Sequence, residues 1–188
     1  MVDHFNNLTE FETITHYKKG AEINFILERE FIMKPKFHNE HIFLSKYFKK
    51  IFNFYPRSVF MQKPHGIIFF ISKKPYEILL KKYFQEITYI RKKLKARVYF
   101  IRYPTSILDL VLNFFSRVNI INISCILVEG QLNENDKIIN LQDLKIEIFI
   151  EMEDCEMSLA LGRRGHYIHL VNAFLKSFIG DLTFFLRS

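Results

Sequence analysis

The residues with the clearest chemical capacity are two adjacent arginines enclosed by glycines, Gly162-Arg163-Arg164-Gly165. Glycine has no Cβ, so it accepts positive φ angles and allows another backbone to approach closely. The residues that follow have apolar side chains at helical spacing, and a helix that begins there directs its first N–H groups and its positive dipole end at the corner. A phosphate group is the natural ligand of such a corner, and two guanidinium groups add charge-assisted contacts to it.

The elements around this corner make the pattern more specific, because Gly-x-x-Gly alone is a common turn and paired arginines are usually solvated. Residues 144–152 alternate as a strand does, and residues 182–186 form a second strand candidate after the helix. The order strand, helix, Gly-x-x-Gly, helix, strand is that of a KH module, whose loop holds the backbone of about four nucleotides of single-stranded nucleic acid.

A family resemblance is specific at this point. Residues 157–175 (MSLALGRRGHYIHLVNAFL) resemble the second KH module of bacterial NusA, a transcription elongation and termination factor whose usual run is close to LSLAIGRRGQNVRLAS. Glu153 and Asp154 resemble the family's strand-to-helix corner, and residues 101–128 resemble the passage that joins its two KH modules. The resemblance therefore covers nearly all of a second module.

The resemblance implies a set of RNA-binding residues at the corner and directly after it: Gly162, Arg163, Arg164, Gly165, His166, Tyr167 and Ile168. We expect backbone phosphate at the glycines and bases between the helix that carries Ile168 and Val171 and the strand at residues 146–150. His166 and Tyr167 stand where the family has Gln-Asn, and an aromatic ring that stacks on a base contributes about 1–3 kcal/mol. His169 is expected on the helix surface, because it lacks the partners of a metal site.

The preceding part of the chain repeats the order of elements without the glycines. We expect its strands at residues 58–62, 66–72 and 97–103, with a helical stretch at residues 76–94. Its corner falls near residues 81–84, where forcing a non-glycine residue to positive φ costs roughly 1 kcal/mol or more. We therefore predict a degenerate first module with a near-continuous helix. Lys81 and Lys82 would supply point charges to phosphate, and packing against the second module is its main role.

The predicted fold class is mixed α/β, with two tandem type II KH modules that each have a three-stranded sheet and helices on one face. The parts are an N-terminal arm (1–34), a degenerate first module (35–103) and a second module (104–188). Residues 22–32 are interpreted as a strand, the remnant of the OB-type barrel that precedes the KH pair in the family. Residues 130–143 are interpreted as a mobile surface insertion.

Two helices can be placed from their apolar faces. Residues 39–54 form an amphipathic helix whose lysine face either touches RNA or is merely solvated, since both interpretations fit the pattern. Residues 107–115 form the first helix of the second module, with Thr105 or Ser106 as N-cap after Pro104.

Composition limits the partners and the compartment. The net charge of +7 suits a phosphate-bearing partner, although membranes and acidic proteins are also counterparts of a basic protein. Two cysteines without metal-ligand spacing indicate reduced thiols, and no apolar run has the length of a membrane span. The 21 Phe and 9 Tyr beside only 6 Gly are typical of an AT-rich genome, so we expect a plastid or a bacterial cytoplasm.

No catalytic constellation, cofactor motif or metal motif is present in the sequence, so we expect a binding protein and not an enzyme. The resemblance implies binding of nascent single-stranded RNA near RNA polymerase, with effects on elongation, termination or antitermination. A first alternative is a ribosomal or ribosome-associated protein that binds rRNA on the small subunit. A second alternative is a protein-interaction scaffold whose RNA corner is vestigial.

Overall fold

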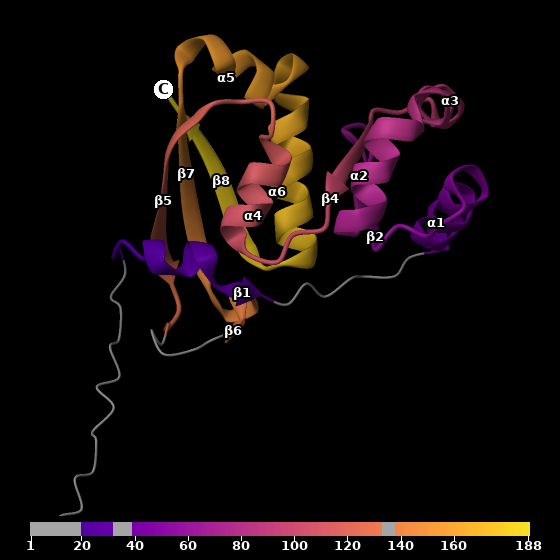
Figure 1. Cartoon of the computed structure of the whole chain (residues 1–188). Coiled ribbons are helices and arrows are strands. Elements are labelled where there is room, and N and C mark those ends of the chain that lie inside the picture. The colour runs from indigo at the N-terminus through magenta and orange to yellow at the C-terminus, as the bar shows by residue number, and fades with distance from the viewer. Residues whose placement is uncertain (1–19, 32–38, 133–137) are drawn as a thin grey trace, which may run out of the picture.

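The computed structural model describes residues 20–31, 39–132 and 138–188 (Figure 1). Two consecutive stretches have the same order of elements: helix, strand, strand, helix, helix, strand. The first module consists of α1 (Asn39–Phe52), β2 (Ser58–Gln62), β3 (Gly66–Ile71), α2 (Lys73–Lys82), α3 (Phe84–Leu94) and β4 (Val98–Arg102). The second module consists of α4 (Ile107–Phe114), β5 (Ile120–Glu129), β7 (Lys145–Met152), α5 (Asp154–Leu161), α6 (His166–Phe178) and β8 (Asp181–Arg187).

The two modules also share the topology of their sheets. The strand orders are β2-β3-β4 and β5-β7-β8. In each sheet the first strand pairs antiparallel with the central strand, and the central strand pairs parallel with the last. Because parallel neighbours need a crossover connection, two helices lie between the parallel strands of each module. The mixed α/β class predicted from the sequence is confirmed.

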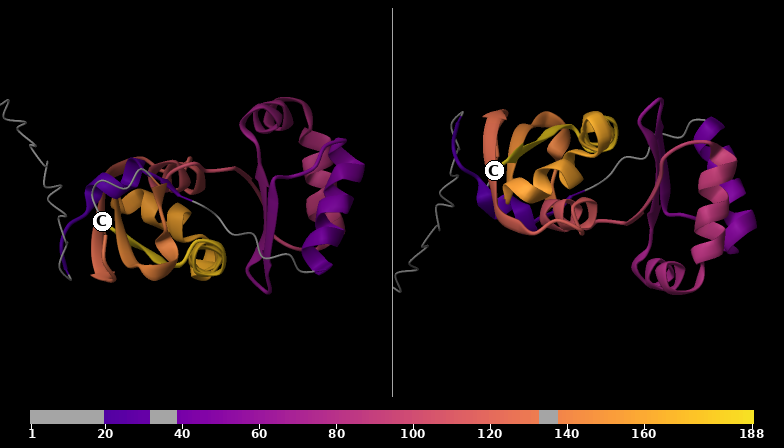
Figure 2. Two further views of the ribbon diagram at one scale, coloured as in Figure 1. Left: turned by 90° about the horizontal axis from the view of Figure 1, so that it is seen from below. Right: turned by 90° about the horizontal axis from the view of Figure 1, so that it is seen from above.

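Strand β3 is buried on both faces, which explains why its sequence is a continuous apolar run. Ile67, Phe69 and Ile71 pack against the helices of the first module. Ile68 and Phe70 point the other way and belong to the core that they share with the second module. Figure 2 shows that α1 and α3 lie on the side of their sheet that faces away from the second module.

The two modules meet through aromatic side chains. Phe174 of α6 lies at 4.6 Å from Phe70 and 5.7 Å from Phe60, measured between ring centroids. Phe178, one helical turn later, lies at 5.5 Å from Phe60. Ring contacts at such distances stabilise a core beyond the burial of their area, so the modules form one packed unit.

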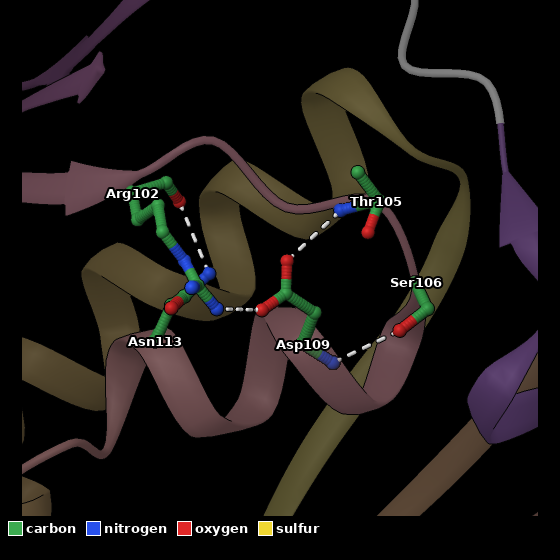
Figure 3. Close-up of polar contacts among 5 residues, drawn as sticks. All are labelled: Arg102, Thr105, Ser106, Asp109 and Asn113. Atoms are coloured by element: carbon green, nitrogen blue, oxygen red, sulfur yellow. Dashed lines mark hydrogen bonds and ion pairs between the residues drawn. The ribbon is translucent and has the colours of Figure 1, made fainter. Parts of the chain in front are cut away.

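The connection between the modules is fixed by a polar network around Asp109 (Figure 3). The Ser106 hydroxyl accepts a hydrogen bond from the Asp109 N–H at 3.1 Å, which confirms Ser106 as the N-cap of α4. The Asp109 carboxylate accepts one from the Thr105 N–H at 3.1 Å and pairs with the Arg102 guanidinium. Asn113 Nδ2 donates to the Arg102 carbonyl at 3.2 Å. The end of β4 is therefore tied to the first two turns of α4.

The strand predicted at residues 22–32 is wrong. The chain instead forms a 3₁₀ turn, η1 (Asn24–Glu28), and a two-residue strand, β1 (Glu30–Phe31), which pairs with β6 (Ile138–Ile139). The buried side chains are Ile23, Ile26 and Leu27, whose three-and-four spacing suits a helical turn. The rest of the predicted arm, residues 1–19 and 32–34, lies outside the described residues.

The connection at residues 130–143 is more than the surface insertion expected. Leu132, Ile139 and Leu141 are all buried in the core, and residues 133–137 lie outside the described part of the chain. A Cβ at Gly180 would lie 2.3 Å from the Leu141 carbonyl oxygen, so the connection packs directly against the turn between α6 and β8. Its ends are part of the fold of the second module.

The helical stretch of the first module is interrupted where its corner was expected. Tyr83, with φ −114° and ψ 39°, separates α2 from α3, so the near-continuous helix has a break of one residue. Within the described ranges, every helix is too short or too polar to cross a bilayer.

Replacing Phe174 by alanine tests the contact between the modules. The side chain is fully buried between Phe60, Phe70 and Phe178, so its loss leaves a cavity and should lower the free energy of unfolding by roughly 3–5 kcal/mol. The matched control is Phe43→Ala on α1, where the side chain is 65% exposed and the expected change is within about 0.5 kcal/mol. Urea unfolding measures both, and similar losses for the two variants would contradict the packing described.

Candidate functional site

The Gly162–Gly165 corner is a tight joint between two helices. Helix α5 ends at Leu161 and α6 begins at His166. Three of the four residues between them have positive φ: Gly162 (φ 69°, ψ 171°), Arg164 (φ 55°, ψ 32°) and Gly165 (φ 69°, ψ 8°). The Gly165 N–H donates to the Gly162 carbonyl at 3.0 Å, which closes the turn.

The two glycines are required for different reasons. Gly162 has a backbone conformation that is essentially restricted to glycine, and a Cβ there would lie 2.7 Å from Cβ of Tyr167. A Cβ at Gly165 would meet nothing closer than 3.6 Å, so only its left-handed conformation favours glycine. Gly162 therefore permits the close approach of the two helices.

The two arginines of the corner are exposed and carry uncompensated charge. Arg163 and Arg164 have exposed side chains, and neither takes part in the ion pairs formed within the described residues. Arg164 is held in the left-handed conformation, which is uncommon for a residue with a Cβ. The corner therefore presents two guanidinium groups to solvent beside the start of α6.

Tyr167 is held by contacts within the protein and is not presented freely at the corner, where the sequence suggested that it could stack on a base. Its hydroxyl donates to the Phe114 carbonyl at 2.7 Å, and its ring lies 4.9 Å from Tyr99 and 6.1 Å from Phe115 between centroids. Burial raises the pKa of this phenol above its ordinary value, with Tyr99 and Tyr76 adding to the rise. Tyr167 instead packs against Tyr99 of the first module and Phe115 of the second, and its Cβ is the atom that a Cβ at Gly162 would meet.

The groove expected beside Ile168 and Val171 is filled by the core. Both side chains are buried, as are Ile146, Ile148 and Ile150 of β7, which were expected on its other wall. Residues 168 and 171 lie on the face of α6 that packs against the sheet, so Ile168 is a core residue and no open groove lies beside it. The prediction was wrong because helical spacing marks a buried face without showing what covers it.

A pocket, here called the junction pocket, lies between the modules and has a volume of about 480 Å³. Its apolar and aromatic lining comes from both modules and includes Tyr76, Leu80, Phe84, Tyr99, Leu159 and Tyr167. Gly162 forms part of the wall, and Arg91 and Arg117 supply positive charge. Phe84 is 77% exposed, which is unusual for a large apolar ring.

The two lysines predicted to contact phosphate in the first module, Lys81 and Lys82, are sequence neighbours of residues that line the junction pocket. Lys81 and Lys82 are exposed at the end of α2, between Leu80 and Phe84, which both line the pocket. Here the first module has an ordinary break at Tyr83, with no positive φ angle and no glycine. Lys81 and Lys82 therefore stand beside a helix break that lacks a turn able to enclose a phosphate.

The structure adds a histidine from the first module that no sequence motif indicates. His65, in the turn between β2 and β3, places its Nδ1 3.2 Å from Nδ1 of His166. The His65 ring also lies 5.7 Å from the His169 ring, which is exposed as expected. Nothing in the sequence signals this contact, because the residues are 101 positions apart. Within the residues that the structure describes, no group of three or more ligating side chains suits a metal ion.

Comparisons with known proteins bear on the fold alone. No family model and no curated protein matches the sequence. Among solved structures, the crystal structure of APE1850 aligns over 80% of this chain and 100% of that chain, with a TM-score of 0.60 and 16% sequence identity. The similarity extends over most of both modules, so the arrangement occurs in another protein.

Alanine substitutions at the two glycines separate their roles. Gly162→Ala should cost roughly 1–3 kcal/mol for the backbone conformation, with a further cost because the new Cβ meets that of Tyr167. Gly165→Ala should cost only about 1–2 kcal/mol, because its surroundings are open. Urea unfolding of the two variants measures the difference. A Gly165→Ala variant that is the less stable of the two would contradict the geometry of the corner.

Proposed function

We propose that the protein binds single-stranded RNA, with the corner at residues 162–165 holding the backbone phosphate. The observation that carries this proposal is the pair of exposed guanidinium groups, Arg163 and Arg164, which form no ion pair with a carboxylate of the described residues and stand on a glycine-enclosed turn at the start of a 13-residue helix. The N–H groups at the start of α6 and its dipole favour an anion at the same place.

The duplicated topology supports the proposal that both modules are KH modules of type II. Each has the core order strand, helix, helix, strand, with the two strands parallel and a third strand antiparallel beside them. Only the second has glycines at the joint of the two helices, so it would hold phosphate and the first would not. Without the glycine corner, the first module would keep its fold and lose the phosphate contact.

The junction pocket is the proposed site for a base. It adjoins Gly162, so a nucleotide whose phosphate lies at the corner has an apolar recess within reach. Phe84 and Leu80 offer exposed apolar surface there, and Arg91 and Arg117 suit the adjacent phosphates. Stacking on aromatic rings accepts any base, and phosphate contacts carry no sequence information. Sequence preference should therefore be weak.

The biological setting proposed is that of NusA, because residues 157–175 resemble its second KH module. In this setting the RNA is nascent and RNA polymerase is the partner, in a plastid or a bacterial cytoplasm. Exposed apolar side chains on α1, Ile42 and Phe43, flanked by Lys46 and Lys50, offer a surface for a protein partner. Helix α1 lies on the side of the first sheet that faces away from the second module (Figure 2), which favours the solvated interpretation of its lysines over RNA contact.

Removing the two guanidinium groups tests RNA binding. We expect Arg163→Gln plus Arg164→Gln to weaken binding of a 12-nucleotide single-stranded RNA about 10–100-fold, since two charge-assisted contacts are lost. The slope of the logarithm of the binding constant against the logarithm of the salt concentration is negative, and its magnitude should decrease by about 1.4, because each neutralised phosphate of a single strand contributes about 0.7. Fluorescence anisotropy over a range of salt concentrations measures both quantities.

The matched control removes two adjacent exposed lysines from α1, Lys49→Gln plus Lys50→Gln. This variant has the same net charge as the arginine variant. If the position of the charges determines binding, and not the net charge alone, its affinity for RNA should stay within about twofold of that of the wild type. Equal binding by the wild type and the arginine variant would make the corner vestigial and leave the scaffold function standing.

Sedimentation of cell extracts distinguishes the two RNA-binding settings. A NusA-like protein should co-purify with RNA polymerase and stay near the top of the gradient when ribosomal subunits are separated. Co-migration with the small subunit that persists after polymerase is removed would replace the transcription role with the ribosomal one.

A further inference from the structure

Five cationic or titratable side chains converge where the turn of the first module meets the start of α6. They are His65, Arg97, Arg164, His166 and His169, here called the junction cluster. They come from three separate places in the chain: the β2–β3 turn, the residue before β4, and the corner with the first turn of α6. The proposed phosphate site uses only one of them, Arg164.

The backbone holds the parts of the first module in this cluster together. The Ile67 N–H donates to the Arg97 carbonyl at 2.9 Å. A Cβ at Gly66 would lie 2.8 Å from that carbonyl oxygen, so residue 66 must be small for the two segments to touch. The backbone segments that carry His65 and Arg97 are therefore held together by close contacts.

The imidazoles are within interaction distance of one another. His65 Nδ1 and His166 Nδ1 are 3.2 Å apart, and their ring centroids are separated by 5.1 Å. A hydrogen bond of this length needs one donor and one acceptor nitrogen, so the pair is compatible with two neutral rings or one protonated ring. His65 and His166 are partly buried, whereas His169, Arg97 and Arg164 are exposed to solvent.

The cluster concentrates positive charge without compensation. Burial lowers the pKa of His166, and Arg97, His65, His169 and Arg164 lower it further. No carboxylate is among these influences, and none of the five residues joins the ion pairs formed within the described residues. Like charges held together raise the free energy of the unliganded protein, and an anion relieves that cost.

We propose that the junction cluster is a second phosphate subsite, which holds the phosphate next to the one at the corner on the same RNA strand. This proposal rests on the RNA-binding function and names residues from the first module that complete the site. Arg97 and Arg164 donate to the phosphate oxygens, and His166 donates once it has taken a proton from solvent. A dication suits the site less well, because both guanidinium groups repel it.

Because binding at the subsite takes up a proton, the affinity for RNA should depend on pH. In the unliganded protein the pKa of His166 is lowered, so the ring is neutral at pH 8. A bound phosphate favours the charged form and raises that pKa. Binding therefore takes up a proton when the pH lies above the unliganded pKa, and affinity rises as the pH falls towards it. A rise of one pKa unit corresponds to about tenfold in affinity.

The experiment measures the affinity of a fluorescein-labelled 12-nucleotide oligouridylate by anisotropy at pH 6.0 and pH 8.0, at constant ionic strength. The wild type should bind about 5–10-fold more tightly at pH 6.0. His166→Gln should lose most of this difference and His65→Gln part of it, because His65 is one of the groups that lower the pKa of His166, and Arg97→Gln should bind at least about 3-fold more weakly at both pH values. Lys50→Gln, which removes one exposed cation from α1, should match the wild type. Circular dichroism at both pH values checks that each variant is folded.

The outcomes separate the subsite from the function on which it rests. Loss of binding in the Arg163→Gln plus Arg164→Gln variant, with unchanged affinity and pH dependence in His166→Gln, His65→Gln and Arg97→Gln, would overturn the subsite alone. Unchanged binding in all of these variants would overturn the RNA-binding function as well. A pH difference that persists unchanged in His166→Gln would also overturn the subsite, because another group would then be titrating.

Discussion

The packing of the second module against the far face of β3 is the constraint on which the rest of the structure depends. Ile68 and Phe70 enter a core with α4 and α6, while their neighbours on the same strand pack against the helices of the first module. A three-stranded sheet of this size would bury too little on its own. Through the shared core, α6 packs against residues of both modules, and it begins at the arginine corner.

Several unfavourable features of the molecule lie close to the corner. The corner has three residues with positive φ, the arginines and histidines near it repel one another, and Phe84 exposes a large ring beside it. Each feature costs free energy in the unliganded protein. Such costs persist where the surrounding structure determines the conformation and a ligand relieves them. Binding of a polyanion with planar apolar groups, such as the single-stranded RNA proposed, would relieve the repulsion and cover the ring.

The sequence predicted what depends on local pattern and missed what depends on long-range contacts. The helix joint at residues 162–165, the N-cap at Ser106 and the limits of β3 follow from glycine, serine and apolar periodicity. The helical face of Ile168 and Val171 was recognised, but periodicity does not say whether such a face meets a base or a core. His65 and the junction pocket depend on how two modules dock, and no local pattern encodes that contact.

The central claim is that an RNA strand passes over the corner between α5 and α6, where the second module meets the first. Photocrosslinking of RNA that contains 4-thiouridine, followed by mass spectrometry of the crosslinked peptides, tests this claim most directly. The account predicts crosslinks at residues 159–166 and at the side chains of the junction pocket, Phe84 and Tyr99 above all. Crosslinks confined to the outer face of the second sheet, at Phe149 and Phe185, or to α1 would contradict it.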